Sequence, residues 1–271
     1  MEKRIIEAGS KSLSAYFRDI SKHRALIFTF AYRDIKVQYA QTFLGVLWSV
    51  IQPVTALLIF TFFFGKIIKV NTGGIPYPLF ALSGISVWSY FSFLMGNAGT
   101  SLIQSRDLIK KISFPKIIIP LSKVFSGASD FLITLLLMFV VMIFDRKVPG
   151  IEIIALPFFI LIALFCGLAA GLWLSTLTVR YRDVHHIIPF LVSFGIWLTP
   201  VFYPTTMLPN KYHPFIYLNP MAGVIEGFRW SLFGGQPPSL YYAGSFIFVF
   251  ILTVGGIINF KKMENRISDW I

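Results

Sequence analysis

Long stretches without a charged residue constrain this chain most. Only 13% of its 271 residues are charged, where a soluble domain carries about 25%. Several uncharged runs reach the roughly 20 residues that a helix needs to cross the hydrocarbon core of a bilayer. Six such spans are predicted, near residues 44–64, 77–105, 120–144, 153–179, 187–203 and 240–260. The sequence therefore predicts an all-α integral membrane protein, with a cytoplasmic interfacial region (1–43) before one six-span domain (44–271).

The remaining charge is unevenly distributed between the spans. The chain has 24 Lys and Arg against 12 Asp and Glu, and membrane proteins concentrate Lys and Arg in their cytoplasmic segments. With the N-terminus inside, the inner segments hold 18 of these cations and the outer segments hold 6. We therefore expect a multi-pass protein of the cytoplasmic membrane with both termini inside. The basic charge then reflects topology and contact with anionic lipids, and no nucleic-acid partner is expected.

Two predicted inner segments could contact a partner. In the first, residues 16–39 interleave apolar and charged residues, which is typical of a helix lying in the headgroup layer. It is either a simple anchor or a docking or gating helix. The second segment has the spacing of a short amphipathic helix. It is either an ordinary basic loop or a short rigid helix that transmits motion from a soluble partner to the membrane helices. Its charged and apolar residues are Arg106, Asp107, Leu108, Ile109, Lys110, Lys111 and Ile112.

The outer segment 204–239 is too rich in proline for a span and too apolar for a solvated loop. A short helix is predicted over Val224–Phe233, opened by Asn219-Pro220 and closed by Gly234-Gly235. Such re-entrant backbone has to be covered by protein or line a water-filled cavity. Glu226 and Arg229 are spaced to pair on one face of the helix. The pair either stabilises an external cap or belongs to an outer gate.

Asp130 is the one acid within the predicted spans. An ionisable group at membrane depth needs a partner or water. Three interpretations stay open: a buried structural partner, a polar group on a substrate path, or a span that begins later than predicted. The 46 aromatic residues similarly suit both lipid contact and a path lined for sugars.

No catalytic, metal or cofactor motif is present. The sequence lacks the G-x-x-x-x-G-K-[ST] loop that cradles ATP phosphates, so another chain would have to supply energy. His185 and His186 are adjacent and do not share a helix face, and the lone Cys166 cannot form an internal disulfide. We therefore predict a protein without its own catalytic residues, metal or cofactor.

Four blocks, in chain order, resemble the membrane subunit of bacterial type-2 ABC exporters, in particular the O-antigen, capsule and teichoic-acid permeases. Together they extend over nearly the whole chain. The blocks are YRDIKVQYAQTFLGVLWSVIQP (Tyr32–Pro53), RDLIKKISFPKIIIPLS (Arg106–Ser122), TVRYRDV (Thr178–Val184) and NPMAGVIEGFRWSLFG (Asn219–Gly234).

The resemblance implies a homodimer with two soluble ATPase subunits that bind ATP and Mg²⁺. The cargo would be a polysaccharide on polyprenyl diphosphate, moving through a channel at the dimer interface. Arg106–Ser113 would be the coupling helix that seats in the ATPase. If Asp130 lies on a substrate path, it would be a polar group of that channel. The resemblance also implies an interfacial gate helix, with Tyr32, Arg33, Asp34, Lys36 and Tyr39, and an outer gate, with Glu226, Arg229 and Trp230.

Other functions fit less well. A type-2 efflux permease for drugs or small lipids often has a large external domain after its first span, whereas the segment here is only residues 65–76. A membrane-embedded transferase would need clustered acids or histidines, which the sequence does not offer. A purely structural scaffold would not explain the partly buried character predicted for 204–239.

Overall fold

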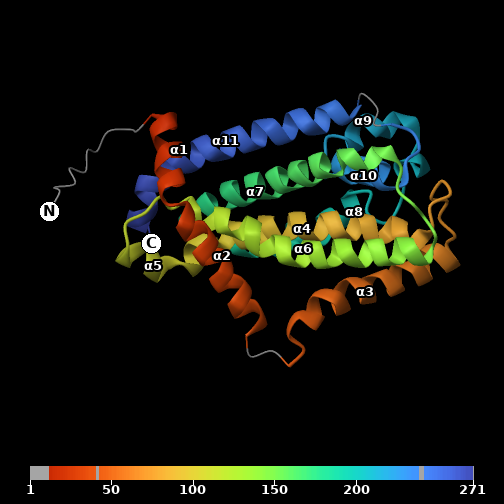
Figure 1. Ribbon diagram of the computed structural model, residues 1–271. Coiled ribbons are helices and arrows are strands. Elements are labelled where there is room, and N and C mark those ends of the chain that lie inside the picture. Colours follow the sequence, from red (N-terminus) through yellow and green to blue (C-terminus); the bar gives the residue numbers. More distant parts are fainter. Residues whose placement is uncertain (1–11, 41–42, 238–240, 271) are drawn as a thin grey trace.

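The computed structural model describes residues 12–40, 43–237 and 241–270. Residues 1–11 and 41–42 of the predicted interfacial region, and residue 240 at the start of the predicted sixth span, lie outside them. Within this part of the chain every regular element is helical. Long helices run side by side, with α1 (Leu13–Lys22), α2 (Arg24–Tyr39) and α5 (Arg106–Lys111) at one end (Figure 1).

Five helical segments of the described chain are long and apolar enough to span a membrane. The first joins a 3₁₀ turn (Gly45–Leu47), α3 (Trp48–Phe60) and a π-helix (Thr61–Ile67). The others are α4 (Tyr77–Gln104), α6 (Ile118–Phe144), α7 (Leu156–Arg180) with the preceding 3₁₀ turn Ile151–Ala155, and α11 (Tyr241–Trp270). These segments confirm the all-α membrane architecture, and by length and apolar composition they correspond to five of the predicted spans.

The remaining predicted span forms the shorter helix α8 (Val184–Leu198). At 1.5 Å per residue, its 15 residues rise about 22 Å, less than the ~30 Å of a hydrocarbon core. The prediction that this span continues to Tyr203 was wrong. A proline disfavours helical backbone in the residue before it, and Thr199, which precedes Pro200, is extended with φ −110° and ψ 140°.

Helix α4 forms the centre of the bundle. In its most apolar window 78% of the residues are buried, compared with 6% for Gly45–Ile67, so α4 is surrounded by protein while α3 lies on the outside. It packs most extensively against α7 and α6. Two glycines on α7 permit the close approach: a Cβ at Gly167 or Gly171 would lie 2.9 or 2.6 Å from Leu94 or Ala98 of α4. This is the small-xxx-small packing typical of membrane helices.

A second apolar cluster lies at the end that carries α1, α2 and α5. It includes Tyr16, Phe30, Ile109, Phe260 and Ile267, from α1, α2, α5 and the last turns of α11. Both ends of the described chain therefore lie at this end of the bundle (Figure 1), as the prediction of six crossings requires.

The opposite end is built from short elements between α8 and α11. They are two 3₁₀ turns (Thr205–Met207 and Asn210–Tyr212), α9 (His213–Ile216) and α10 (Pro220–Phe233). The predicted capping residues are confirmed: the side chain of Asn219 accepts a hydrogen bond from the N–H of Met221, and Gly234 ends the helix with φ 69°. The helix begins at Pro220 rather than at Val224.

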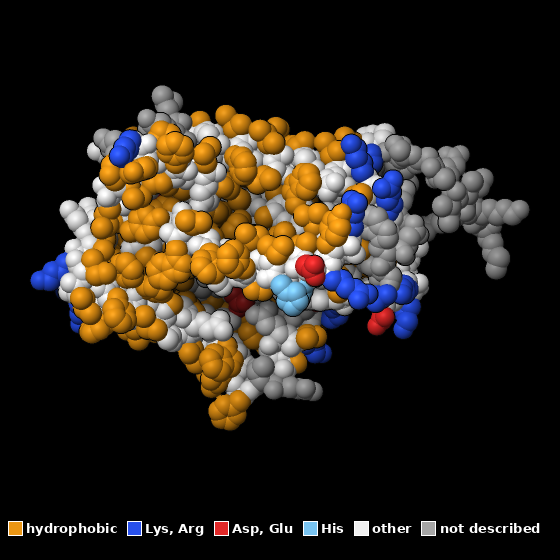
Figure 2. Space-filling model, turned by 180° about the vertical axis from the view of Figure 1, so that it is seen from behind, with side chains coloured by type: hydrophobic (Ala, Val, Ile, Leu, Met, Phe, Trp, Pro, Cys, Tyr) orange, Lys and Arg blue, Asp and Glu red, His pale blue; other side chains and the backbone are white. Residues whose placement is uncertain are grey.

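Figure 2 shows the surface character. Hydrophobic side chains cover most of the length of the molecule, while Lys and Arg side chains gather at the end that carries α1, α2 and α5. Exposed apolar residues along this surface include Phe190, Phe194 and Trp197 of α8 and Leu58 of α3. Such a surface suits contact with lipid or with other membrane helices.

Candidate functional site

The segment predicted as a coupling helix is α5, which covers Arg106–Lys111. Ile109 is buried in the apolar cluster at this end, and Leu108 is half-buried. The charged side chains of Asp107, Lys110 and Lys111 are exposed, as is that of Arg106. The exposed Ile112 follows the helix in an extended conformation. The helix therefore presents a polar face outward from the basic end of the bundle.

Helix α2 carries the residues predicted for the interfacial gate helix, and they divide into two groups. The side chains of Tyr32, Arg33 and Lys36 are exposed, whereas Asp34 contacts α6. Its Oδ2 lies 2.6 Å from Nζ of Lys123, which is only 7% exposed. Arg33 binds the other oxygen of Asp34, with Nη2 at 2.9 Å. A buried cation that loses its partner is strongly destabilising, so this contact holds α2 against α6.

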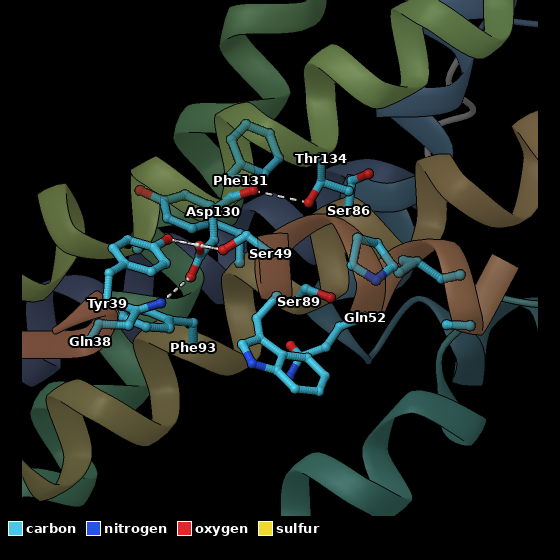
Figure 3. Close-up of a pocket in the computed structure, with 16 residues that line it drawn as sticks. Gln38, Tyr39, Ser49, Gln52, Ser86, Ser89, Phe93, Asp130, Phe131 and Thr134 are labelled. Atoms are coloured by element: carbon cyan, nitrogen blue, oxygen red, sulfur yellow. Dashed lines mark hydrogen bonds between the residues drawn. The ribbon is translucent and has the colours of Figure 1, made fainter. Parts of the chain in front are cut away.

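Asp130 makes a second contact between α2 and α6 and also includes α3. Its carboxylate accepts hydrogen bonds from Nε2 of Gln38 at 2.7 Å and from the hydroxyls of Tyr39 and Ser49 at 2.5 Å each. Figure 3 shows these three side chains pointing toward Asp130. Burial, followed by the hydrogen bond to Asp130, raises the pKa of Tyr39, so its phenol remains a donor at neutral pH. Asp130 therefore has structural partners, and its place on a substrate path stays a prediction.

A cavity of about 410 Å³ lies beside Asp130, between α3, α4 and α6. Hydroxyl and amide groups line it, from Gln52, Ser86, Ser89 and Thr134, together with the aromatic ring of Phe93 (Figure 3). A smaller cavity of about 290 Å³ shares Gln38 and Phe93 and reaches Lys123. Polar groups therefore continue along one side of α4, facing α2 and α6.

Replacing Asp130 with Asn is expected to loosen α2 from α6. The change removes the charge that strengthens three hydrogen bonds, and a bond to a charged group contributes about 1.5–3 kcal/mol. Spin labels at the exposed positions Tyr32 and Leu136 would report the distance between the helices. Cys166 is 1% exposed, and no other cysteine is present, so only introduced thiols react. We expect a broader distance distribution in Asp130→Asn. The exposed acid Asp145 supplies the control. Distance distributions of equal width in Asp130→Asn and Asp145→Asn would contradict the conclusion that Asp130 holds α2 against α6.

The outer end is organised around Arg229 of α10, which is 5% exposed. Its guanidinium donates to the carbonyls of Pro200 at 2.6 Å, Val201 at 2.5 Å and Phe80 at 3.2 Å, and to the hydroxyl of Ser83 at 3.2 Å. The guanidinium carbon also lies 3.6 Å from the centre of the Phe80 ring. Arg229 therefore joins α10 to α4 and to the non-helical backbone after α8.

Glu226 has a separate set of partners. Its carboxylate accepts hydrogen bonds from the hydroxyls of Thr205, Tyr217 and Tyr242, with the Tyr217 bond at 2.5 Å and the Tyr242 bond at 2.6 Å. Burial, and then the charge of Glu226, raises the pKa of Tyr217, which keeps that phenol protonated.

The predicted ion pair between Glu226 and Arg229 is wrong. Both residues lie in the part of the chain that the structure describes, and no salt bridge joins them. The carboxylate turns to the tyrosines, while the guanidinium turns to backbone carbonyls. The third residue predicted for the outer gate, Trp230, is half-buried with its ring 6.4 Å from that of Phe159.

Sequence reasoning missed Lys123, Gln38 and Ser49 as partners of the predicted acids. Lys123 was a usable signal, because a cation at the start of an apolar helix needs a partner as much as Asp130 does. Gln38 and Ser49 carried no comparable signal.

In the described chain no group of three or more His, Cys, Asp and Glu residues is placed to hold a metal ion. His185 and His186 lie with ring centres 5.7 Å apart.

This chain is similar in sequence to a known transporter family and to several named proteins. The pattern of the family described as ABC-2 type transporter matches residues 25–233. The O-antigen export system permease protein RfbA of Klebsiella pneumoniae is 28% identical over 239 residues, which cover 88% of this chain and 91% of that protein. RfbA of Myxococcus xanthus is 28% identical over 214 residues, 78% of this chain and 82% of the relative. The polysialic acid transport protein KpsM of Escherichia coli is 22% identical over 223 residues, 80% and 86% respectively. Since the family pattern extends over most of the residues, from α2 to the end of α10, this chain belongs to the ABC-2 type transporter family.

Proposed function

We propose that this chain is the permease subunit of an ATP-driven exporter that moves a polysaccharide, carried on polyprenyl diphosphate, across the bacterial cytoplasmic membrane. The observation that carries the proposal is its similarity, over most of both chains, to relatives named for O-antigen export and polysialic acid transport. The efflux permease for drugs or small lipids remains the second candidate, although the connection between the first two spans, residues 68–76, contains no separate domain.

Two copies of this chain and two soluble ATPase subunits form the proposed complex. The sequence has no P-loop, so ATP and Mg²⁺ bind on the partner and this chain contributes no catalytic residue. The exposed face of α5 at the basic end is where the ATPase would dock. Placing this end in the cytoplasm agrees with the distribution of Lys and Arg. The apolar faces of α3 and α8, which little of this chain covers, are available to the second copy.

The proposed mechanism is mechanical. ATP binding brings the ATPase subunits together and displaces α5, and the membrane helices packed behind α5 shift around the dimer axis. A polymer is too long for one enclosed pocket, so it passes through a continuous channel between the two copies. The network around Arg229 lies at the end opposite α5, where it would influence the outer mouth of such a channel, and the polar cavity beside Asp130 lies near the middle of α4 and α6, where it would influence the path between the mouths.

The test is export in the native host. Deletion of the gene is expected to remove the polysaccharide from the cell surface and to leave lipid-linked polymer inside, as measured by antibody labelling of intact and of permeabilised cells. Returning the gene restores export only when the ATPase partner has an intact P-loop lysine. Normal surface polysaccharide in the deletion strain, together with increased sensitivity to drugs, would favour the efflux permease instead.

A further inference from the structure

The link between α5 and α6 is held by the last turns of α11. The backbone N–H of Lys116, in this link, donates to Oε1 of Glu264 at 2.5 Å, and Nζ of Lys116 donates to the carbonyl oxygen of Glu264 at 3.0 Å. The two residues are 148 positions apart in the sequence. The contact therefore joins two elements that no local connection brings together.

The position of the Glu264 carboxylate suits the start of α6. The first N–H groups of a helix lack partners within the helix, and the helix dipole favours negative charge there. The side chain before α6 does not cap it, because Ile117 is apolar. Glu264 supplies a carboxylate to this end from a different helix, and the Lys116 ammonium in turn binds a backbone carbonyl in the last two turns of α11.

The surrounding apolar cluster makes this contact part of a packed unit. Ile109 of α5, Ile117 of the link and Ile267 of α11 belong to one cluster, in which Ile267 is fully buried. Tyr16 of α1 lies in the same cluster, and burial, followed by the charge of Glu264, raises its pKa. Helix α11 continues beyond the span end predicted at residue 260, and these additional turns carry Glu264 and Ile267.

We propose that Glu264 is a positioning residue for transport: it fastens the α5–α6 link to α11, so that displacement of α5 moves α6 and α11 together. This inference rests on the proposed function, in which an ATPase pushes α5. The backbone at Ile112 is extended and Pro115 follows, so helical hydrogen bonding is interrupted between the end of α5 and the turn at Pro115 that leads into α6. Without the carboxylate, the link would bend when α5 is displaced, and α6 and α11 would move less. Each ATP hydrolysed would then transport less polymer.

The first experiment measures the fastening without the ATPase. Hydrogen exchange of residues 106–120 is compared in the full chain in nanodiscs for wild type, Glu264→Ala, Glu264→Gln and Lys262→Ala. Gln retains an oxygen that accepts the Lys116 N–H, whereas Ala does not, and Lys262 is exposed on the same helix. Loss of a hydrogen bond to a charged group is expected to raise local exchange about tenfold or more in Glu264→Ala. Glu264→Gln should show a smaller rise, and Lys262→Ala should match wild type.

The second experiment measures coupling in proteoliposomes that contain the complete complex with its ATPase. The ratio of polymer transported to ATP hydrolysed is expected to fall severalfold in Glu264→Ala, with ATPase activity retained, and to be largely recovered in Glu264→Gln. A residue that only stabilised the fold would lower transport and ATPase activity together and leave their ratio unchanged.

The two measurements separate failure of this inference from failure of the proposed function. Unchanged hydrogen exchange of residues 106–120 in Glu264→Ala would show that Glu264 does not hold the α5–α6 link, whatever the protein transports. Increased exchange with an unchanged transport-to-ATP ratio would overturn the coupling role alone. A wild-type chain that neither binds nor stimulates the ATPase would overturn the proposed function and the coupling role with it, while the exchange measurement would still decide the fastening.

Discussion

Replacing both Lys110 and Lys111 with Glu is expected to lower polysaccharide export by at least about tenfold, because reversing charges in a docking surface costs several kcal/mol and 1.4 kcal/mol is a factor of ten. Both side chains are exposed on α5, while Ile109 anchors the helix from its buried face. The substitutions therefore change the surface proposed to dock the ATPase without removing a packing contact. Membrane insertion and the folded state are expected to be unaffected.

The adjacent pair Arg146 and Lys147 provides a matched control. These residues are exposed after the far end of α6, so their replacement with Glu makes the same change in net charge at the opposite end of the bundle. Surface polysaccharide, co-purification of the ATPase and stimulated ATPase activity would be measured for both double variants. Normal export and co-purification in Lys110→Glu/Lys111→Glu would remove α5 as the docking element.

Replacing Arg229 with Met is expected to destabilise the protein by about 3–5 kcal/mol, the usual cost of removing one partner from a buried charged network. Three carbonyls and one hydroxyl lose their donor, and Met offers none. A change of this size corresponds to a fall of roughly 6–20 °C in apparent melting temperature for a chain of this length. Fluorescence-detected size exclusion of heated, detergent-solubilised protein would measure it.

A second variant separates the position of Arg229 from its chemistry. A Cβ at Gly84 of α4 would lie 2.6 Å from Nη2 of Arg229 and 2.7 Å from the carbonyl oxygen of Val201. Gly84→Ala is therefore expected to displace the guanidinium and lower the melting temperature while Arg229 remains. Exchanging the charges, with Glu226→Arg and Arg229→Glu, should be worse than either single replacement, because the two residues have separate partners. If the exchanged variant instead recovered the melting temperature of the wild type, the two residues would pair with each other, which would contradict their separate partners.

How much the sequence could predict depends on the distance between interacting residues. Apolar length predicts α4, α6 and α7 well, since membrane insertion is decided by the composition of each segment. Local capping rules predict the ends of α10, where Asn219 and Gly234 satisfy backbone groups within a few residues. The end of α8 was not predicted from its composition, because apolar residues continue past Pro200, before which the helix ends.

The partners of buried charges lie beyond this local information. Asp130 is bound by residues 81 to 92 positions away, and Arg229 by residues 28 to 149 positions away. The spacing of Glu226 and Arg229 satisfies the rule for a helical pair, yet more distant groups compete for both side chains. A short-range rule gives the possible pairs on a helix, and the surrounding helices decide which hydrogen bonds form.

The length of α8 has a consequence for the surrounding bilayer. A helix of about 22 Å is mismatched to a hydrocarbon core of ~30 Å, and a mismatched segment is accommodated by local thinning of the lipid or by association with another subunit. The carbonyls that follow this helix are bound by Arg229, so the polypeptide can turn at this depth without exposing unpaired groups to acyl chains. Hydrophobic mismatch beside α8 would then favour assembly of two copies, and bilayers with longer acyl chains would strengthen that preference.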